Sequence, residues 1–291
     1  MKIFITGAAG FIGKAAVKEL VGRGHSLLAL VRSKYQAAKL DRMNNVQTVI
    51  GDFSDPAKYR AALRKFQPDA AIHLAWEGIP DDSPRIAIKN IAASMLVFKE
   101  LSEAGVKKII GVGSCREYGD PRGKIGESAS VAFPYNTLYA AKAHLHRLSS
   151  AFFEKPEVDF IWARLFYVYG PGQRPGALIP SAIRAKINGQ KLDIKDKRAA
   201  HDFIFIEDVA RALALIIEKH RFRHSDVYNI GSGKMVSVLD VLDLVNDLTS
   251  RRSAHPGGFF ADISQITKET GWRPHTGIKE GIAKTMTHYN K

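Results

Sequence analysis

The first 13 residues of the chain constrain its fold more than any other segment. The apolar run at residues 2–6 predicts a buried strand, and a loop of sequence GAAGFIG, residues 7–13, follows it directly. An amphipathic segment at residues 11–23 then predicts a helix. A buried strand that turns through glycines into a helix is typical of a parallel sheet with helices on its faces.

The same alternation of apolar runs and amphipathic segments continues through the first half of the chain. Further strands are predicted at residues 26–31, 46–50, 70–74, 108–112 and 158–165, and helices at 56–66, 85–104 and 137–153. The strands are apolar almost without interruption, which fits burial on both faces. The pattern predicts an α/β protein with a Rossmann-type doubly wound parallel sheet.

The glycine loop has the properties of a pyrophosphate site. Gly7, Gly10 and Gly13 have no Cβ, so the backbone can approach a phosphate closely. The helix that begins with Phe11 and Ile12 offers unbonded N–H groups and the positive end of its dipole. The spacing is GxxGxxG instead of the general GxGxxG, and a tight turn without a ligand is the alternative interpretation.

The residues after the second and third strands indicate which dinucleotide would bind. An acidic residue about 20 positions after the loop would bind the ribose 2′-hydroxyl of NAD, but residues 20–40 contain none. Arg32 and Ser33 stand at the end of the second strand instead, and both can bind a 2′-phosphate. This favours NADP, with NAD possible if Arg32 only stacks on the adenine or faces water. Asp52 and Phe53 are predicted to contact the adenine, although a plain turn fits them equally well.

The sequence pattern changes at the turn-rich segment 170–176, of sequence GPGQRPG. Beyond it, helices are predicted at residues 179–188, 206–220 and 238–250, with a strand at 227–230 and two further segments at 264–271 and 278–287. We therefore expect a dinucleotide-binding domain over residues 1–170 and a smaller, mixed substrate-binding lobe over 171–291. Residues 206–230 can return to the first domain.

Composition narrows the classes of function. The chain has 43 basic and 29 acidic residues, a net charge of +14, which suggests an anionic partner. A single cysteine excludes a disulfide framework, and with no export signal visible a cytoplasmic location is expected. No apolar run is long enough to span a bilayer, so no membrane segment is expected, and no metal site is expected either.

Several further blocks follow one another in a recognisable order. They are HLA at residues 73–75, GSCREYG at 113–119, Tyr139 with Lys142, RLFYVYGPG at 164–172, DFIFIEDVA at 202–210, YNIGSG at 228–233 and GWRP at 271–274. Together with the glycine loop they resemble the extended short-chain dehydrogenases/reductases, the group of nucleotide-sugar epimerases, dehydratases and reductases. The resemblance extends over essentially the whole chain.

The resemblance implies roles for three residues. In the family, a tyrosine is the general acid/base on a sugar hydroxyl or carbonyl, a lysine lowers its pKa and holds the nicotinamide ribose, and a serine or threonine hydrogen-bonds the reacting oxygen. These roles fall on Tyr139, Lys142 and Ser114, and Leu74 and Ala75 would also contact the cofactor. A tyrosine with an ordinary pKa of about 10 is a poor base at neutral pH, and an adjacent ammonium group lowers that value.

The spacing of this pair departs from the family pattern, because two residues instead of three separate Tyr139 from Lys142. Residues i and i+3 still share a helix face, so a working pair is expected. If Lys142 keeps the family position, Leu138 stands where the tyrosine should be, and if Tyr139 keeps it, Ala143 replaces the lysine. Impaired proton transfer with the cofactor still bound is the alternative. Nearby fallback acids are Tyr118, Tyr135 and His144.

The resemblance also predicts the substrate side of the site. Family dehydratases have an acidic residue at the position of Arg116, which weighs against dehydration here and leaves a 4-keto-sugar reductase or an epimerase. Tyr167 and His201 replace the asparagine and arginine that relatives place near the substrate phosphates, and the basic residues of 174–198 could meet a diphosphate or form a solvated face. The predicted substrate residues are Trp76, Arg116, Tyr167, Arg174, Arg198 and His201.

Three hypotheses follow for the function. The first is an NAD(P)-dependent oxidoreductase or epimerase that acts on a nucleotide-linked sugar. The second is a non-catalytic NAD(P)-binding sensor or regulatory protein on the same fold. Nucleic-acid binding is the least favoured, since aromatic residues do not alternate with the basic clusters. By resemblance a homodimer is expected through helices 85–104 and 137–153, although their apolar positions also fit packing on the sheet.

Overall fold

A computed structural model describes residues 1–131, 136–154, 157–190, 192–194, 196, 199–219, 227–248 and 257–289. The chain divides into two compact units. The first unit comprises Met1–Gly119, Val131–Arg164 and Leu213–Tyr228, and the second comprises Asp120–Ser130, Leu165–Ala212 and Asn229–Lys291. Each unit is thus made of segments from both sides of residue 170, the boundary that the sequence analysis predicted while allowing residues 206–230 to return to the first domain.

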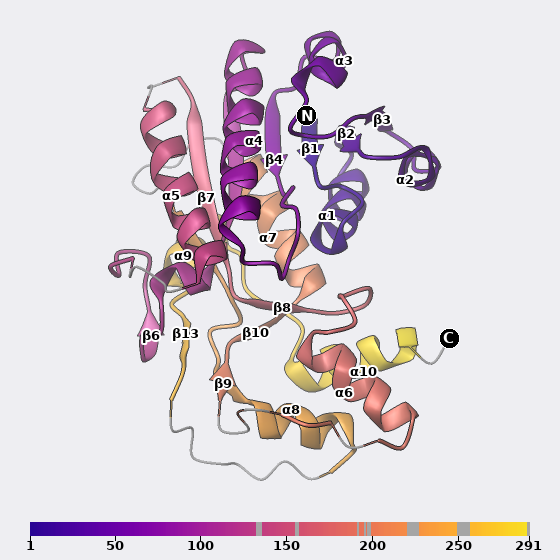
Figure 1. The fold of residues 1–291 in the computed structure, drawn as a ribbon, viewed down its shortest axis with the longest axis vertical. Helices are drawn as coiled ribbons and strands as arrows, with labels where there is room; N and C mark the ends of the chain where they lie inside the picture. Colours follow the sequence, from indigo (N-terminus) through magenta and orange to yellow (C-terminus); the bar gives the residue numbers. More distant parts are fainter. Residues whose placement is uncertain are drawn as a thin grey trace. The chain divides into compact units, whose positions relative to one another are not determined.

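The centre of the first unit is a seven-stranded sheet with the order β11-β7-β5-β4-β1-β2-β3. Figure 1 labels β1 to β4 and β7 of this sheet. Its strands are β1 (Lys2–Thr6), β2 (Ser26–Val31), β3 (Val46–Ile50), β4 (Ala70–His73), β5 (Lys108–Ser114), β7 (Asp159–Leu165) and β11 (Val227–Ile230). The β1 strand pairs in parallel with β2 on one side and with β4 on the other. This confirms the predicted doubly wound parallel sheet, and it places a topological switch point at the carboxyl ends of β1 and β4.

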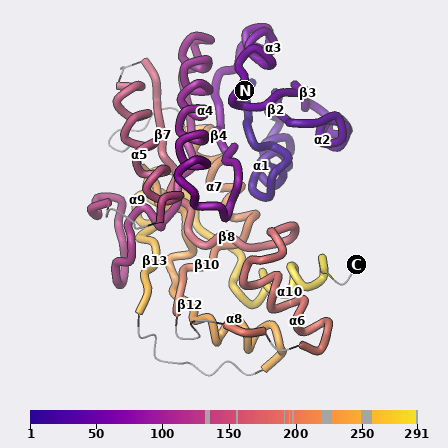
Figure 2. Tube along the Cα trace, in the orientation of Figure 1, coloured from indigo at the N-terminus to yellow at the C-terminus, as the bar shows by residue number. Residues whose placement is uncertain are grey.

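The helices of this unit are α1 (Phe11–Gly22), α2 (Lys34–Leu40), α3 (Arg60–Phe66), α4 (Pro84–Glu103) and α5 (Thr137–Phe152). The α4 and α5 helices pack together, as Figures 1 and 2 both show. The helix predicted over 56–66 is in fact a 3-10 turn, η1 (Pro56–Lys58), followed by α3. The break lies at Tyr59, which has a non-helical φ of −126° and a fully buried ring stacked on Phe4.

Aromatic rings fill the core between this sheet and α4 and α5. The Phe98 ring of α4 makes edge contacts with Phe153 and Phe160, whose ring centroids lie 5.7 and 5.5 Å away. Trp162 of β7 is fully buried beside them. Aromatic side chains bury a large apolar area each, so this cluster fixes the position of α5 against β5 and β7.

The second unit contains three pairs of short strands and most of the remaining helices. The pairs are β6 (Gly123–Ile125) with β13 (Phe259–Ala261), β8 (Tyr167–Tyr169) with β10 (Phe203–Phe205), and β9 (Ala200–His201) with β12 (Val236–Ser237). The helices are α6 (Leu178–Ile187), α7 (Ile206–Glu218), α8 (Val238–Val245), α9 (Ser264–Thr270) and α10 (Ile278–Tyr289); α7 continues from the second unit into the first.

Two buried aspartates connect sequence blocks of the second unit that are far apart along the chain. The Asp202 carboxylate accepts backbone hydrogen bonds from Ser232, Gly233 and Ala261, at 2.6 to 3.0 Å. Burial raises the pKa of Asp202, while these bonds oppose the rise. The Asp208 carboxylate likewise accepts from the backbone of His275 and Thr276, at 2.9 and 3.0 Å. The blocks around 202–210, 228–233 and 271–274 therefore hold this unit together.

Within the described ranges, no helix has both the length and the apolar character needed to cross a bilayer. Across the same residues, no three His, Cys, Asp or Glu side chains are grouped so that they could hold a metal ion.

Candidate active site

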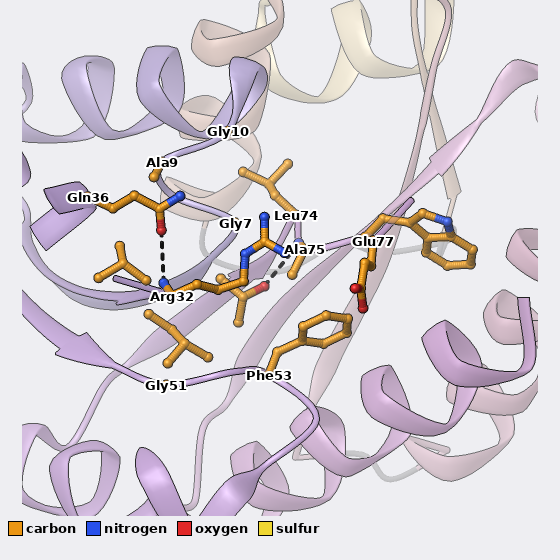
Figure 3. Close-up of a pocket in the computed structure, with 14 residues that line it drawn as sticks. Gly7, Ala9, Gly10, Arg32, Gln36, Gly51, Phe53, Leu74, Ala75 and Glu77 are labelled. Carbon is orange, nitrogen blue, oxygen red and sulfur yellow. Dashed lines mark hydrogen bonds between the residues drawn. The ribbon is translucent and has the colours of Figure 1, made fainter. Parts of the chain in front are cut away.

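A pocket of about 290 Å³ lies where the glycine loop meets the carboxyl ends of β1, β2 and β4 (Figure 3). Its walls combine six of the predicted cofactor residues with the predicted substrate residue Trp76. The full lining is Thr6, Gly7, Ala9, Gly10, Leu30, Val31, Arg32, Gln36, Gly51, Phe53, Leu74, Ala75, Trp76 and Glu77. A crevice at this edge of an open parallel sheet is where ligands of α/β proteins generally bind.

The glycine loop packs closely against neighbouring backbone, and the N-terminus of α1 that follows it has no side-chain cap. Gly7 has a φ of +70°, and a Cβ there would lie 2.8 Å from the backbone of Leu74 and Ala75. A Cβ on Gly13 would collide with the carbonyl oxygen of Gly7. The N-cap of α1 is Gly10, which makes no side-chain capping bond, and the first turn has no acidic residue. The N-terminus of α1, with Phe11 and Ile12 in its first turn, is therefore suited to an anion.

Two side chains stand at the end of β2, where the sequence predicts the adenosine ribose. Arg32 is exposed and lines the pocket, and its backbone N–H donates to Oε1 of Gln36 over 2.9 Å, as Figure 3 shows. Ser33 is the N-cap of α2 and accepts a hydrogen bond from the Gln36 backbone over 3.3 Å. Accepting that bond does not use the Ser33 hydroxyl proton, which remains suited to an anion.

The two residues predicted at the adenine differ in their surroundings. Phe53 lines the pocket, whereas the Asp52 carboxylate accepts hydrogen bonds from the backbone and hydroxyl of Ser54, at 2.9 and 2.6 Å. Partial burial opposes ionisation of Asp52, but the bonds from Ser54 and the nearby Lys89 and Arg32 hold its pKa below the ordinary value. Asp52 thus stabilises its own turn.

A buried hydrogen-bonded chain positions the segment after β4. His73 Nδ1 lies 2.8 Å from Thr6 Oγ1, and His73 Nε2 lies 2.9 Å from Ser94 Oγ. The same Thr6 hydroxyl accepts from the backbone N–H of Ala75 over 3.2 Å. Burial, with a smaller effect from Lys142, lowers the pKa of His73 to about 3, so the imidazole is neutral at physiological pH. The chain connects β1, β4 and α4 behind the pocket wall.

Lys142 of α5 points into the unit and is buried. Its Nζ donates to the Val112 carbonyl of β5 over 3.2 Å and lies 4.8 Å from the ring centroid of Trp76. Burial lowers the pKa of Lys142 to about 8, and the Glu117 carboxylate opposes that decrease. The lysine is therefore mostly protonated at pH 7, close to the pocket residue Trp76.

Tyr139 lies half-buried one turn earlier in α5. The guanidinium carbon of Arg116 is 5.7 Å from its ring centroid, and the backbone N–H of Arg116 donates to Ser114 Oγ over 3.2 Å. Asn136 caps the helix by accepting from the backbones of Leu138 and Tyr139. Arg116 thus contacts Ser114 through its backbone and lies near the Tyr139 ring through its guanidinium, and Lys142 lies beside Trp76. Of these five residues, Trp76 alone lines the pocket.

The other predicted substrate residues belong to the second unit. The ring of Tyr167 stacks on that of His201, with centroids 4.0 Å apart and 21° between the planes. Arg174 is exposed in the turn after β8. Arg198 lies outside the described residues, as do Lys195, Lys197 and the fallback acid Tyr135.

The two remaining fallback acids, Tyr118 and His144, make contacts outside the pocket. Tyr118 is buried beneath the guanidinium of Arg164, which is 4.4 Å from its ring centroid. His144 is exposed, and its Nδ1 lies 2.8 Å from the carbonyl oxygen of Ala140. Neither contact involves the pocket.

Sequence reasoning missed three residues that position the site. Gln36 fixes the backbone of Arg32. Asn90 of α4 accepts from the backbone N–H of Glu77 over 2.7 Å and donates back to the Glu77 carbonyl over 3.0 Å, so it holds the end of the pocket wall. Glu117 bonds the backbone of Ser114 over 2.7 Å. The only sequence signal was for Glu117, the acid beside the position where dehydratases have theirs.

Comparison with known proteins decides the family. The family described as the NAD dependent epimerase/dehydratase family matches residues 3–231. This chain belongs to that family. The match confirms the resemblance predicted from the sequence and agrees with the pocket at the glycine loop.

Members of this family that resemble the chain cover it almost completely. The dTDP-glucose 4,6-dehydratase of Salmonella typhimurium is 26% identical, over 99% of this chain and 92% of the relative. The UDP-glucose 4-epimerase of Lactobacillus helveticus is 24% identical, over 97% and 95%. Among solved structures, MoeE5 in complex with UDP-glucuronic acid and NAD is 29% identical, with a TM-score of 0.83 over 100% of this chain and 99% of that one. The UDP-glucose 4-epimerase of Thermotoga maritima with UDP-glucose shares the fold, at 23% identity, a TM-score of 0.86, and coverage of 100% and 99%.

Proposed function

We propose that this protein is an NAD(P)-dependent enzyme that transfers a hydride between its cofactor and a carbon of a nucleoside-diphosphate sugar, as a 4-keto-sugar reductase or an epimerase. The observation that carries the proposal is the grouping of Ser114, Arg116 and Tyr139 in the same unit as Lys142 and the glycine-loop pocket. Relatives named for dTDP-glucose, UDP-glucose and UDP-glucuronic acid support the substrate class.

The pocket fits a dinucleotide on structural grounds. The uncapped N-terminus of α1 suits the pyrophosphate, Phe53 provides an apolar wall for the adenine, and Arg32 stands where a ribose 2′-phosphate would lie. The indole Nε1 of Trp76 is buried without a hydrogen-bond partner among the described residues, which points to an acceptor on a bound molecule. When bound, the nicotinamide would accept a hydride from the sugar carbon or donate one to it.

Side chains of the protein would transfer the proton that accompanies the hydride. We infer that the Tyr139 phenol gives or takes the proton of the sugar oxygen and that Ser114 hydrogen-bonds the same oxygen. A cation near a tyrosine favours the phenolate form. Lys142, protonated at pH 7, and the Arg116 guanidinium, 5.7 Å from the Tyr139 ring, would both act in that direction.

Arg116 also favours redox chemistry at the sugar without loss of water. It lies beside Tyr139 at the position where dehydratases of the family have an acid. Elimination needs a proton donor for the leaving hydroxyl, and a guanidinium does not release a proton at physiological pH. The product is therefore expected to have the mass of an epimer or of a reduced keto-sugar, and mass spectrometry distinguishes these from a dehydrated product.

The cofactor preference provides a first prediction. Arg32→Ala is expected to weaken NADPH binding by about 10- to 100-fold, because a charge-assisted contact to a phosphate contributes roughly 1.5–3 kcal/mol. NADH binding should change less than threefold. Isothermal titration with both cofactors measures this, with Arg42→Ala as a matched control, since Arg42 is also an exposed cation. Wild-type preference for NADH, or equal loss for both cofactors, would contradict the assignment.

A second prediction concerns the oligomer. We infer a homodimer through α4 and α5, where Ile88, Leu96 and Leu148 are 68%, 39% and 51% exposed. Apolar side chains exposed in a group are typical of an interface. The double variant Ile88→Lys/Leu148→Lys should sediment as a monomer, whereas Ile187→Lys on α6, where Ile187 is 52% exposed, should stay dimeric. A monomeric wild type in sedimentation velocity would refute the dimer.

The alternative function is a non-catalytic NAD(P)-binding sensor. It is favoured by one specific feature, the separation of Tyr139 and Lys142 by two residues instead of three. It predicts cofactor binding without conversion of any nucleotide sugar.

A further inference from the structure

The Glu117 carboxylate, three residues after Ser114, is fully buried. It lies in the 3-10 turn η2 (Cys115–Tyr118), and three donors reach it, one from β5 and two from β7. Its Oε1 accepts from the backbone N–H of Ser114 over 2.7 Å, and its Oε2 accepts from Arg164 Nε over 3.0 Å. The indole N–H of Trp162 lies 3.2 and 3.1 Å from the two oxygens. Each carboxylate oxygen is thus hydrogen-bonded.

The residues around the Glu117 carboxylate pack closely against it. A Cβ on Gly113 would collide with Glu117 Oε1 and with Trp162 Nε1. Glycine at this position of β5 therefore leaves the space that the two side chains occupy. On the far side, the His146 ring of α5 stacks on Trp162, with centroids 5.2 Å apart. Elements β5, η2, α5 and β7 therefore meet at one anionic side chain.

A buried ion pair of this kind needs an explanation beyond stability. Glu117 and Arg164 have exposed side-chain fractions of 0% and 2%. Burying two charges removes their hydration, and well-packed apolar residues often stabilise a protein as much or more. The position of the pair, directly behind Ser114 and Arg116, indicates a role in the chemistry of the site.

We propose that Glu117 is a positioning residue of the reaction centre, which fixes the Ser114 turn and supplies the buried negative charge that acts on Lys142. This inference rests on the proposed function, because it takes Ser114 and Lys142 as members of the reaction centre. The first role follows from the capping box between the two residues, in which the Glu117 carboxylate accepts from the Ser114 N–H and the Ser114 side chain accepts from the Glu117 backbone.

The second role follows from the groups around Lys142. The groups that face its ammonium are the Val112 carbonyl of β5, the Trp76 ring and the neutral His73 of β4. The charge of Glu117 in η2 favours the protonated form of Lys142, and Glu117 is itself paired with Arg164 of β7 over 3.0 Å. Tyr139 and His146 lie on the same helix as Lys142. Loss of the Glu117 charge would leave the burial of Lys142 uncompensated and lower its pKa further.

The test measures the titration of Lys142 directly in the full-length protein. With lysine labelled by ¹³C at Cε and the Lys142 signal assigned from a Lys142→Arg variant, the midpoint should lie near pH 8 in wild type and at lower pH in Glu117→Gln. Glu117→Asp, which keeps the charge on a shorter side chain, should restore the midpoint. The control Glu103→Gln, at an exposed ion pair of α4, should not move it.

The pH profile of turnover is the second measurement. The alkaline limb of kcat should move to lower pH in Glu117→Gln, in parallel with the Lys142 midpoint, and kcat should fall more than KM changes. If Glu117→Gln does not fold, the double variant Glu117→Gln/Arg164→Met removes both charges and takes its place.

The outcomes separate the two proposals. An unmoved Lys142 midpoint in a folded Glu117→Gln protein would overturn the inference about Glu117, whatever the enzyme does. A moved midpoint in a protein that converts no nucleotide sugar would support the electrostatic role of Glu117 and overturn the proposed function instead.

Discussion

Replacing Tyr139 with phenylalanine is expected to lower kcat on a nucleotide sugar by about 10²- to 10⁴-fold, because a positioned acid/base contributes a factor of that order. The phenol oxygen is the only heavy atom removed, so the affinity for cofactor and substrate should change little. Steady-state kinetics gives kcat, and fluorescence titration with NAD(P)H gives the cofactor Kd.

The matched control for this variant is Tyr35→Phe. Tyr35 lies on α2 and is 70% exposed, and its loss should leave kcat unchanged. Wild-type kcat in Tyr139→Phe would contradict the assigned acid/base, and the same measurement in Tyr118→Phe and Tyr135→Phe would then show which phenol transfers the proton.

Replacing Arg164 with methionine is expected to destabilise the protein by about 3–5 kcal/mol, because it leaves the buried Glu117 carboxylate without its cation. For a chain of this size that loss corresponds to a decrease in Tm of roughly 10 °C. Differential scanning calorimetry measures the change. Lys99→Met is the control, since the Lys99–Glu103 pair is 54% and 41% exposed, and such pairs contribute about 1 kcal/mol at most.

The double variant Glu117→Gln/Arg164→Met identifies the cause of that destabilisation. It removes both buried charges, and it should recover most of the lost Tm. A Tm in Arg164→Met within 2–3 °C of wild type, or a double variant less stable than the single one, would show that the pair is not the source.

The buried parallel strands were the most predictable part of the fold. The strands β1, β2, β3 and β11 have the predicted limits. The strands β1, β2 and β11 are almost completely buried and have nearly continuous apolar sequences, whereas the edge strand β3 was predictable from its β-branched residues. The strands of two or three residues in the second unit, such as β9 and β12, were not predicted. They are too short to show a period, and only pairing across the fold defines them.

The candidate site was predictable where its residues are close in sequence. The glycine loop, Arg32 and Ala75 follow strands whose order places their ends at one edge of the sheet, so their convergence on one pocket could be predicted. The role of Glu117 could not be predicted in this way, because its partners Trp162 and Arg164 are 45 and 47 residues away. The contacts of the buried Lys142 with Trp76 and Val112 could not be predicted either, because these residues are far from it in sequence.

The measurement that tests the central claim most directly is conversion of nucleotide sugars, followed by ¹H NMR at the sugar C4 position. Purified protein would be incubated with UDP-glucose, UDP-glucuronic acid or dTDP-glucose and NAD(P)⁺, and with the corresponding 4-keto-sugars and NADPH. We expect a C4 epimer or a reduced sugar in at least one reaction with wild type, formed about 10²- to 10⁴-fold more slowly with Tyr139→Phe. Tight NAD(P)H binding with every sugar unchanged would contradict it and favour the sensor.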